Sequence, residues 1–317
     1  MAPDFWASNK ETQHGLYGTA NLNLADPLHV IIGARMDWYD FRDDALWIPV
    51  GTTDEDRWGS AFEYNAHLTK YVGIVFDVDR NHSLYASYSD IFKPQDLKTT
   101  ANKYITPIVG KNFEFGVKGE YFDGALNLSA ALFRINEDNR GIPDGPCPFN
   151  PQMTCYRPAG QVRSEGFELE AQGALTERWQ IAAGYTHVTT KVSKDPDPAT
   201  VGQKQNTHLP KQQFKLSTTY RMPGDAWRVG ASLRWQGRIY HEDDWAGYVY
   251  HTGQRAYAVV DALVGYQANA RLNLQLNVYN LFDKRYFSSI NAQPVVWGGN
   301  TVYGTPRDFR LTARYRF

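Results

Sequence analysis

The most regular feature of this sequence is an alternation of apolar and polar residues with a period of two. In the last segment the apolar positions are Phe309, Leu311, Ala313, Tyr315 and Phe317. Successive side chains of a β-strand point to opposite faces of a sheet, so this segment has one face suited to lipid and one suited to water. The same pattern recurs in residues 167–175, 227–236 and 272–278.

Counting such segments predicts about thirteen strands of roughly ten residues, the length with which a tilted strand crosses a bilayer. No apolar run approaches the roughly 20 residues that a membrane-spanning helix needs, so any crossing must use strands. We therefore predict an all-β fold, an antiparallel transmembrane β-barrel.

The predicted connections alternate between short and long. The short ones are 25–28, 79–82, 122–125, 176–178, 222–226 and 267–271. The long ones are 41–57, 93–110, 137–160, 191–211, 241–255 and 283–304. Short periplasmic turns and long extracellular loops are typical of bacterial outer-membrane barrels. A soluble sandwich has no reason to alternate its connections in this way.

The alternation also orients the chain. The first predicted strand, 14–24, runs from the outside to a short turn, so residues 1–13 are expected to be the remnant of an extracellular loop and residues 14–317 the barrel. The last strand should leave Phe317 on the periplasmic side. Single-chain barrels have even strand numbers, so an odd count that begins outside predicts missing upstream strands, and we interpret the chain as a fragment.

Composition agrees with a barrel whose inner wall is wet: the mean hydropathy is −0.52 and 14% of the residues are aromatic. Rings gather where predicted strands end, among them Trp179, Tyr220, Trp227, Tyr240 and Tyr315, as in the girdles of membrane barrels. Ordinary strand propensity is the alternative explanation. The net charge of −1 offers no basic field for nucleic acid, so we expect no nucleic-acid partner.

The two cysteines, Cys147 and Cys155, lie in one segment rich in Pro, Asn and Gly, without the other ligands of a zinc site. A local disulfide in an oxidising compartment is the favoured interpretation.

No catalytic group stands out. Glu168 and Glu170 share the predicted inner face, but charges lining a solvated lumen explain them better than an acid and base pair. The consecutive residues 241–244 could bind a metal, although adjacent side chains seldom converge on one ion. We predict no enzyme activity, no metal site and no cofactor.

Aromatic and basic residues inside the long loops are the candidate ligand-binding residues, because flat rings with a few donors suit bulky, partly apolar ligands. They are Trp47, Tyr104, Tyr156, Arg157, Trp245, Tyr248, Tyr250, Trp297 and Tyr303. The alternative is that these rings pack the loops against each other.

Several local sequences resemble the TonB-dependent receptors. Tyr279–Tyr286 (YNLFDKRY), Tyr303–Arg307 (YGTPR) and the terminal Phe317 look like the C-terminal signature of that family. Ser83–Gln95 (SLYASYSDIFKPQ) and Gly160–Glu170 (GQVRSEGFELE) are similar to its ferric-siderophore branch, which contains hydroxamate and pyoverdine receptors.

The resemblance implies a 22-stranded barrel in the bacterial outer membrane, filled by an N-terminal plug that is absent from this chain. It implies uptake of a ferric siderophore, energised by the TonB–ExbB–ExbD complex through the missing plug. The terminal strand resembles the signal read by the outer-membrane assembly machinery. Two alternatives stay open: a receptor for another cargo such as haem or cobalamin, and a passive porin. His241 and His251, which share a loop, are the residues on which a haem receptor would depend.

Overall fold

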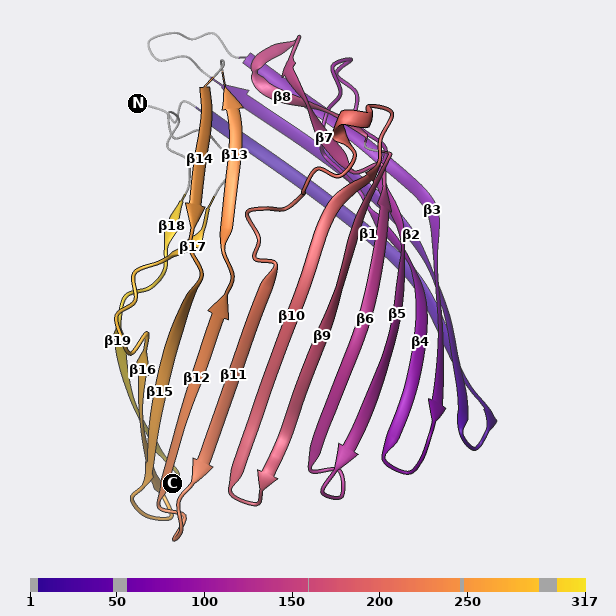
Figure 1. The fold of residues 1–317 in the computed structure, drawn as a ribbon. Helices are drawn as coiled ribbons and strands as arrows, with labels where there is room; N and C mark the ends of the chain where they lie inside the picture. The colour runs from indigo at the N-terminus through magenta and orange to yellow at the C-terminus, as the bar shows by residue number, and fades with distance from the viewer. Residues whose placement is uncertain (1–4, 48–55, 159, 246–247, 291–300) are drawn as a thin grey trace.

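The computed structural model describes residues 5–47, 56–158, 160–245, 248–290 and 301–317, most of which form one curved antiparallel sheet (Figure 1). Thirteen strands follow each other through the sheet in chain order. They are β1 (Phe5–Ala25), β2 (Leu28–Trp47), β3 (Asp56–Asp77), β4 (His82–Lys93), β5 (Ile108–Tyr121), β6 (Leu126–Asp138), β9 (Gln161–Thr176), β10 (Trp179–Lys194), β11 (Gln212–Arg221), β12 (Trp227–Gln236), β15 (Tyr257–Gln267), β16 (Leu272–Tyr279) and β19 (Asp308–Tyr315). The predicted all-β architecture and its strand number are confirmed.

All six predicted short turns join consecutive strands at one end of the sheet, and the described parts of the long connections lie at the other end (Figure 1). The C-terminus lies at the end with the short turns, as predicted. Three long connections carry hairpins of their own. These are β7 (Gly141–Cys147) with β8 (Asn150–Pro158), β13 (Ile239–Trp245) with β14 (Tyr248–Gln254), and β17 (Phe287–Ser289) with β18 (Val302–Tyr303). A fourth contains the short 3₁₀ helix η1 (Pro198–Thr200).

The first three strands are longer than predicted, at 21, 20 and 22 residues. The strand expected at 14–24 begins at Phe5, and residues 5–13 pair with 39–47 of β2. About 9–11 residues suffice to cross a bilayer, so these strands extend well beyond it at the end with the long loops. The assignment of residues 1–13 to an extracellular loop stays a prediction.

The outer face of the sheet is apolar and exposed, the reverse of a soluble protein. On β19 the side chains of Phe309, Leu311 and Tyr315 are 63%, 74% and 51% exposed. Leu311 and Phe309 pair with Leu276 and Val278 of β16, which continue the same face. Exposure of this extent is stable only against lipid, since water would not support so large an apolar surface.

The inner face carries polar clusters that are already paired. On β2, Asp37 is only 4% exposed and accepts hydrogen bonds from the Arg35 guanidinium (2.8 Å) and the Gln13 amide of β1 (2.8 Å). Near the short turns, Asp77 accepts a hydrogen bond from Ser83 (2.6 Å) and lies 3.1 Å from the ring of His29. A buried charge is costly unless it is paired, so these contacts explain how the wall tolerates inward carboxylates.

Exposed aromatic side chains mark the end of the sheet that carries the short turns. Trp179 pairs with Tyr220 across β10 and β11, and the rings of Trp227 and Tyr266 lie 4.5 Å apart across β12 and β15. Trp179, Tyr220 and Trp227 are 43%, 39% and 46% exposed on the outer face. Rings with one apolar and one polar side favour the interface between hydrocarbon and water, so this row agrees with a girdle.

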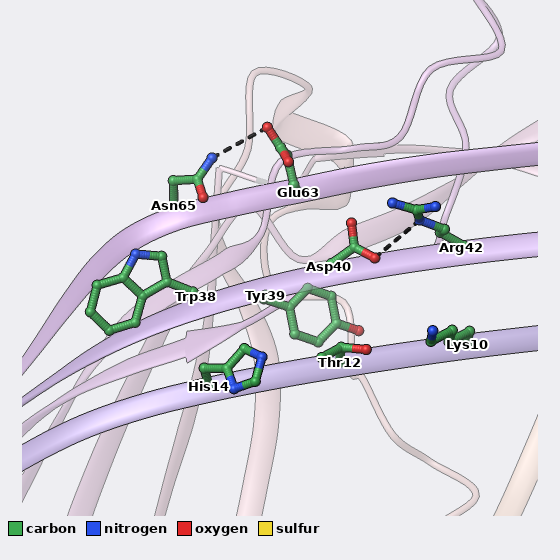
Figure 2. A pocket seen from close by; sticks show the side chains of 9 residues that line it. All are labelled: Lys10, Thr12, His14, Trp38, Tyr39, Asp40, Arg42, Glu63 and Asn65. Carbon is green, nitrogen blue, oxygen red and sulfur yellow. Dashed lines mark hydrogen bonds and ion pairs between the residues drawn. The ribbon is translucent and has the colours of Figure 1, made fainter.

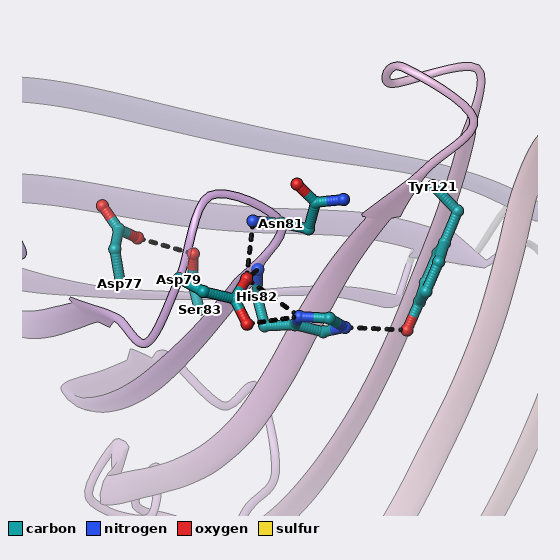
Figure 3. A network of polar contacts seen from close by, with 6 residues as sticks. All are labelled: Asp77, Asp79, Asn81, His82, Ser83 and Tyr121. Carbon is teal, nitrogen blue, oxygen red and sulfur yellow. Dashed lines mark hydrogen bonds and ion pairs between the residues drawn. The ribbon is translucent and has the colours of Figure 1, made fainter.

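The turn between β3 and β4 shows how one carboxylate fixes a short connection (Figure 3). Asp79 accepts hydrogen bonds from the backbone N–H groups of Asn81 (2.7 Å) and His82 (2.9 Å) and contacts the His82 ring at 3.0 Å. The other ring nitrogen of His82 lies 3.1 Å from the Tyr121 hydroxyl on β5. The Asn81 N–H, followed by the His82 ring, keeps the pKa of Asp79 below its usual range.

The connection from β16 to β19 is held by Asn280, which is 3% exposed. Its amide donates to the carbonyls of Lys284 (2.9 Å) and Thr305 (3.0 Å), and its carbonyl accepts from the Lys284 N–H (2.8 Å). Its backbone N–H donates to Asp261 of β15 (2.8 Å). One side chain therefore joins the two segments of the C-terminal motif.

Within the described ranges, no helix has both the length and the apolar character needed to cross a membrane.

Candidate ligand-binding surface

Three of the long connections pack into one block at the loop end of the sheet. Gln95, 7% exposed, donates to the carbonyls of Thr106 (2.7 Å) and Asn139 (2.8 Å) and accepts from the Gly141 N–H (3.1 Å). Segment 94–107 is thereby fixed to the start of the β7–β8 hairpin. Below it, Ile142, Val162 and Val192 form a small buried apolar cluster. The loops at this end therefore have a defined shape.

A disulfide between Cys147 and Cys155 closes the β7–β8 hairpin, with Cα atoms 4.9 Å apart. Both residues are at most 1% exposed. The bridge holds two strands whose pairing is irregular between Pro143 and Pro146.

Arg157 does not point a free cation into the mouth of the barrel. Its guanidinium donates to Asp195, just after β10, at 2.9 Å, and the Asp195 side chain is inaccessible to solvent. The Arg157 hydrogen bond keeps the pKa of Asp195 below its usual range. Arg157 thus ties the β7–β8 hairpin to the next loop.

Tyr104 is also engaged within the loop block. Its ring lies 4.6 Å from that of Phe62 on β3 and 6.1 Å, edge-on, from that of Phe41 on β2. The Lys98 ammonium lies 5.3 Å from the centre of the same ring. These contacts join segment 94–107 to the long β2–β3 hairpin.

Tyr156 lies in the same block and is partly exposed. Its backbone N–H donates to the carbonyl of Lys98 at 2.8 Å. Tyr104, Tyr156 and Arg157 are therefore brought together around segment 94–107 and the β7–β8 hairpin.

Tyr303 is the most open of the candidates whose side chains are described. It lies on β18, is 71% exposed, and rests against Phe287 of β17 with the ring centres 4.8 Å apart. Its location is separate from the block formed by the other three. A flat ring presented in this way can stack on a ligand without rearrangement.

Of the other candidates the structure gives only the backbone position. Trp47 ends β2, Trp245 ends β13, and Tyr248 and Tyr250 lie in β14. Their side chains lie outside the described part of the structure, as does the whole of Trp297.

At the β13–β14 hairpin the structure brings together Arg238, Tyr240 and His251, of which the sequence named only His251 as a possible ligand-binding residue. Arg238 lies 5.2 Å from the ring centre of Tyr240, and that ring stacks 6.0 Å from His251 of β14. The sequence placed Tyr240 in an aromatic girdle because it lies near a strand end. The pairing of β13 with β14, which brings Tyr240 and His251 together, is not visible in a local pattern.

A shallow hollow of about 260 Å³ lies across β1, β2 and β3 where these strands extend toward the loops (Figure 2). Apart from the rings of Trp38 and Tyr39 its lining is polar. Four of the lining side chains bind each other: Arg42 pairs with Asp40 (3.3 Å), and Asn65 donates to Glu63 (3.3 Å). These groups satisfy each other, so the hollow is better explained as the water-exposed surface of a long hairpin than as a ligand site.

No group of three or more His, Cys, Asp or Glu side chains converges as a metal site among the residues that the structure describes. His251 is instead paired with Glu242 at 3.2 Å.

A wall of antiparallel strands with an apolar outer face, a polar inner face and turns and loops segregated to opposite ends defines an outer-membrane β-barrel. The family model for the β-barrel of TonB-dependent receptors matches residues 2–281. The chain therefore belongs to the TonB-dependent receptor family. The predicted family is confirmed, as is the location in the bacterial outer membrane.

Curated relatives are siderophore receptors. The chain is 34% identical to the ferripyoverdine receptor of Pseudomonas aeruginosa over an alignment of 328 residues. This alignment covers 99% of the chain and 37% of the relative. It is 31% identical over 281 residues to the catecholate siderophore receptor Fiu of Escherichia coli K12, covering 85% of the chain and 34% of the relative. The chain thus spans just over a third of the length of these relatives.

Solved structures agree. The crystal structure of the Pseudomonas aeruginosa ferripyoverdine receptor bound to ferripyoverdine matches with a TM-score of 0.78 and 33% identity, over 98% of this chain and 39% of that one. The closed form of Fiu from Escherichia coli K12 matches with a TM-score of 0.78 and 27% identity, over 98% of this chain and 45% of that one.

Proposed function

We propose that the intact protein imports a ferric siderophore across the outer membrane, with energy supplied through TonB. The observation that carries this proposal is the match, along nearly the whole chain, to receptors whose names specify ferripyoverdine, together with the matching fold of one such receptor. Transport of this kind needs binding and a conformational change but no covalent chemistry, so we propose no enzyme activity.

The chain supplies one section of wall and six long connections to that function. In the described sheet β1 and β19 are the edge strands, each paired on one side only. An unpaired edge exposes backbone groups that lipid cannot satisfy, so we propose that further strands close the barrel and that a plug inside it contacts TonB.

We propose that the nine loop residues contribute to ligand binding in two ways. Tyr303, Trp47, Trp245, Tyr248, Tyr250 and Trp297 contact the siderophore itself through their rings. Tyr104, Tyr156 and Arg157 act indirectly, because their contacts set the shape of the loop block. This division predicts that substitutions in the second group change binding together with loop structure.

Uptake of radioactive iron by an iron-starved strain lacking its own receptor tests the cargo. The strain carries the full-length gene and receives ferripyoverdine, a ferric catecholate siderophore or haem in parallel. Uptake of a ferric siderophore that disappears when TonB is deleted supports the proposal. Growth on haem alone would assign the cargo to haem, and steady conductance of small ions by the purified protein in planar bilayers would identify a porin.

Replacing Tyr303 with alanine tests the binding surface. The loss of an exposed ring that stacks on a ligand costs about 1 kcal/mol or more, which is at least about a fivefold weaker affinity. Tyr220→Ala is the matched control, because that ring is exposed at the opposite end of the sheet. Equal affinity for ferripyoverdine in both variants, measured by fluorescence quenching, would remove Tyr303 from the site.

A further inference from the structure

An amphipathic groove crosses the outer face of β4, β5, β6 and β9. The strand register places Phe113, Arg134 and Glu165 in one row, and Phe115, Leu132 and Phe167 in the next row toward the short turns. These residues line an open hollow of about 830 Å³. Phe113, Phe115 and Leu132 are 47%, 54% and 61% exposed, so the floor of the groove is an uncovered apolar surface.

The end of the groove toward the loops is cationic. Arg134 and Arg163 approach the same carboxylate oxygen of Glu165, at 3.2 Å and 3.5 Å. Arg163 also donates to the side-chain carbonyl of Asn136 at 2.9 Å. Two guanidinium groups therefore share one carboxylate, and the Arg134 side chain remains 56% exposed.

The surrounding charges leave this excess uncompensated. The register places Lys111 and Lys191 in the same row as Arg163, together with Asp90. Asp90 is already held by the Tyr88 hydroxyl at 2.5 Å and the Lys70 N–H at 3.0 Å. Two neighbouring rows carry these charges. Together they hold four cations and two carboxylates, a net charge of +2: Arg134 and Glu165 in one row, and Asp90, Lys111, Arg163 and Lys191 in the other.

We propose that this groove binds a phosphorylated lipid of the surrounding membrane. Its phosphate lies between Arg134 and Arg163, and an acyl chain follows Phe113, Phe115, Leu132 and Phe167 toward the membrane centre. Guanidinium groups bind phosphate with paired, charge-assisted hydrogen bonds, and the apolar rows lie at the depth of the hydrocarbon directly below the charged headgroups. A lipid is the occupant that carries both the anion and the chain.

Native mass spectrometry of the full-length protein with lipid A, a diphosphorylated and acylated glycolipid, tests the proposal. The variant Arg134→Gln with Arg163→Gln should retain lipid A about tenfold more weakly, whereas Arg178→Gln with Arg271→Gln removes the same charge at the opposite end of the sheet and should bind as the wild type does. Phosphatidylcholine should bind equally to all three proteins. Retention of the folded band on unheated gels confirms that each variant is assembled.

Arg134→Lys with Arg163→Lys keeps the charge without the planar donors, and should bind lipid A between the wild type and the glutamine variant. Equal retention of lipid A by both glutamine variants would overturn the site. It would mean that the groove arginines contribute nothing to lipid binding, or that they contribute only through the overall charge of the protein. Displacement of lipid A by millimolar inorganic phosphate would assign the arginines to a free anion and overturn the role of the acyl chain.

Discussion

Gly304 lies directly against the ring of Tyr286, so that a β-carbon at position 304 would overlap three carbons of that ring. The Gly304 N–H donates to the Tyr286 carbonyl at 2.8 Å, and the Tyr286 ring also stacks on that of Tyr257 of β15, with the ring centres 4.7 Å apart. The two halves of the C-terminal motif, YNLFDKRY and YGTPR, therefore meet at these two residues.

Substitution of Gly304 with alanine should destabilise the protein. The ring cannot move away from the new methyl group without losing its contact with Tyr257, and overpacking of this kind costs about 1–3 kcal/mol. Urea unfolding followed by tryptophan fluorescence measures the change. Gly18→Ala is the control, since a β-carbon there meets no atom within 4 Å. A variant at 304 as stable as the one at 18 would show that the ring is not constrained.

Substitution of Asn280 with alanine should be more damaging. It removes three side-chain hydrogen bonds made by a buried residue, takes their partner from backbone groups of Lys284 and Thr305, and places alanine at a φ of 48°, which asparagine tolerates better. We expect a loss of about 2–4 kcal/mol in the free energy of unfolding. The control is Asn127→Ala, whose exposed side chain makes a single bond of 3.5 Å to Gly124. A similar midpoint in urea for both variants would contradict the role of Asn280 in joining the two segments of the C-terminal motif.

The strands and turns could be predicted because a sheet with lipid on one face and water on the other imposes a period of two on the sequence. The same reasoning underestimated the lengths of β1, β2 and β3. Beyond Trp38 both faces of β2 meet water or other loops, so outward positions such as Asp40 and Arg42 become polar and the alternation fades although the strand continues.

The loop contacts could not be read from the sequence for a different reason. Tyr104 meets Phe62, and Arg157 meets Asp195, across long separations that only the folded loops determine. A ring in a long loop has the same local sequence whether it binds a ligand or packs. The groove beside Arg134 and Arg163 was missed because its rows run across several strands rather than along one.

The ion pair between Arg157 and Asp195 should make the loop block sensitive to acid. The folded protein lowers the pKa of Asp195, so the pair stabilises the block above the ordinary aspartate pKa of about 3.9, and this contribution is lost as the pH falls through the depressed value. Limited proteolysis of segment 195–211 between pH 7 and pH 3 should show cutting that increases on the acid side.

Arg157→Ala should produce the same loosening already at pH 7. It removes the cation from a buried, ionised carboxylate and leaves it with backbone N–H partners such as that of Asp197, at a cost of at most about 3 kcal/mol. Arg178→Ala is the control, because its partner Asp225 is 60% exposed and water can replace the arginine. If protease cuts segment 195–211 equally in the two variants at pH 7, the pair does not hold the loops together.

Removal of the disulfide by Cys147→Ser with Cys155→Ser should loosen the β7–β8 hairpin and leave the sheet intact. The bridge closes a short loop of the chain, which is worth about 2–3 kcal/mol, and a two-stranded hairpin with irregular pairing is marginal without it. We expect faster proteolysis within 141–158 and an unchanged urea midpoint for the barrel. Met153→Ser, at an exposed position of the same hairpin, is the control. Because Arg157 and Tyr156 depend on this hairpin to reach Asp195 and Lys98, ferripyoverdine affinity should fall together with hairpin order, and a loosened hairpin with unchanged affinity would separate the loop block from the binding site.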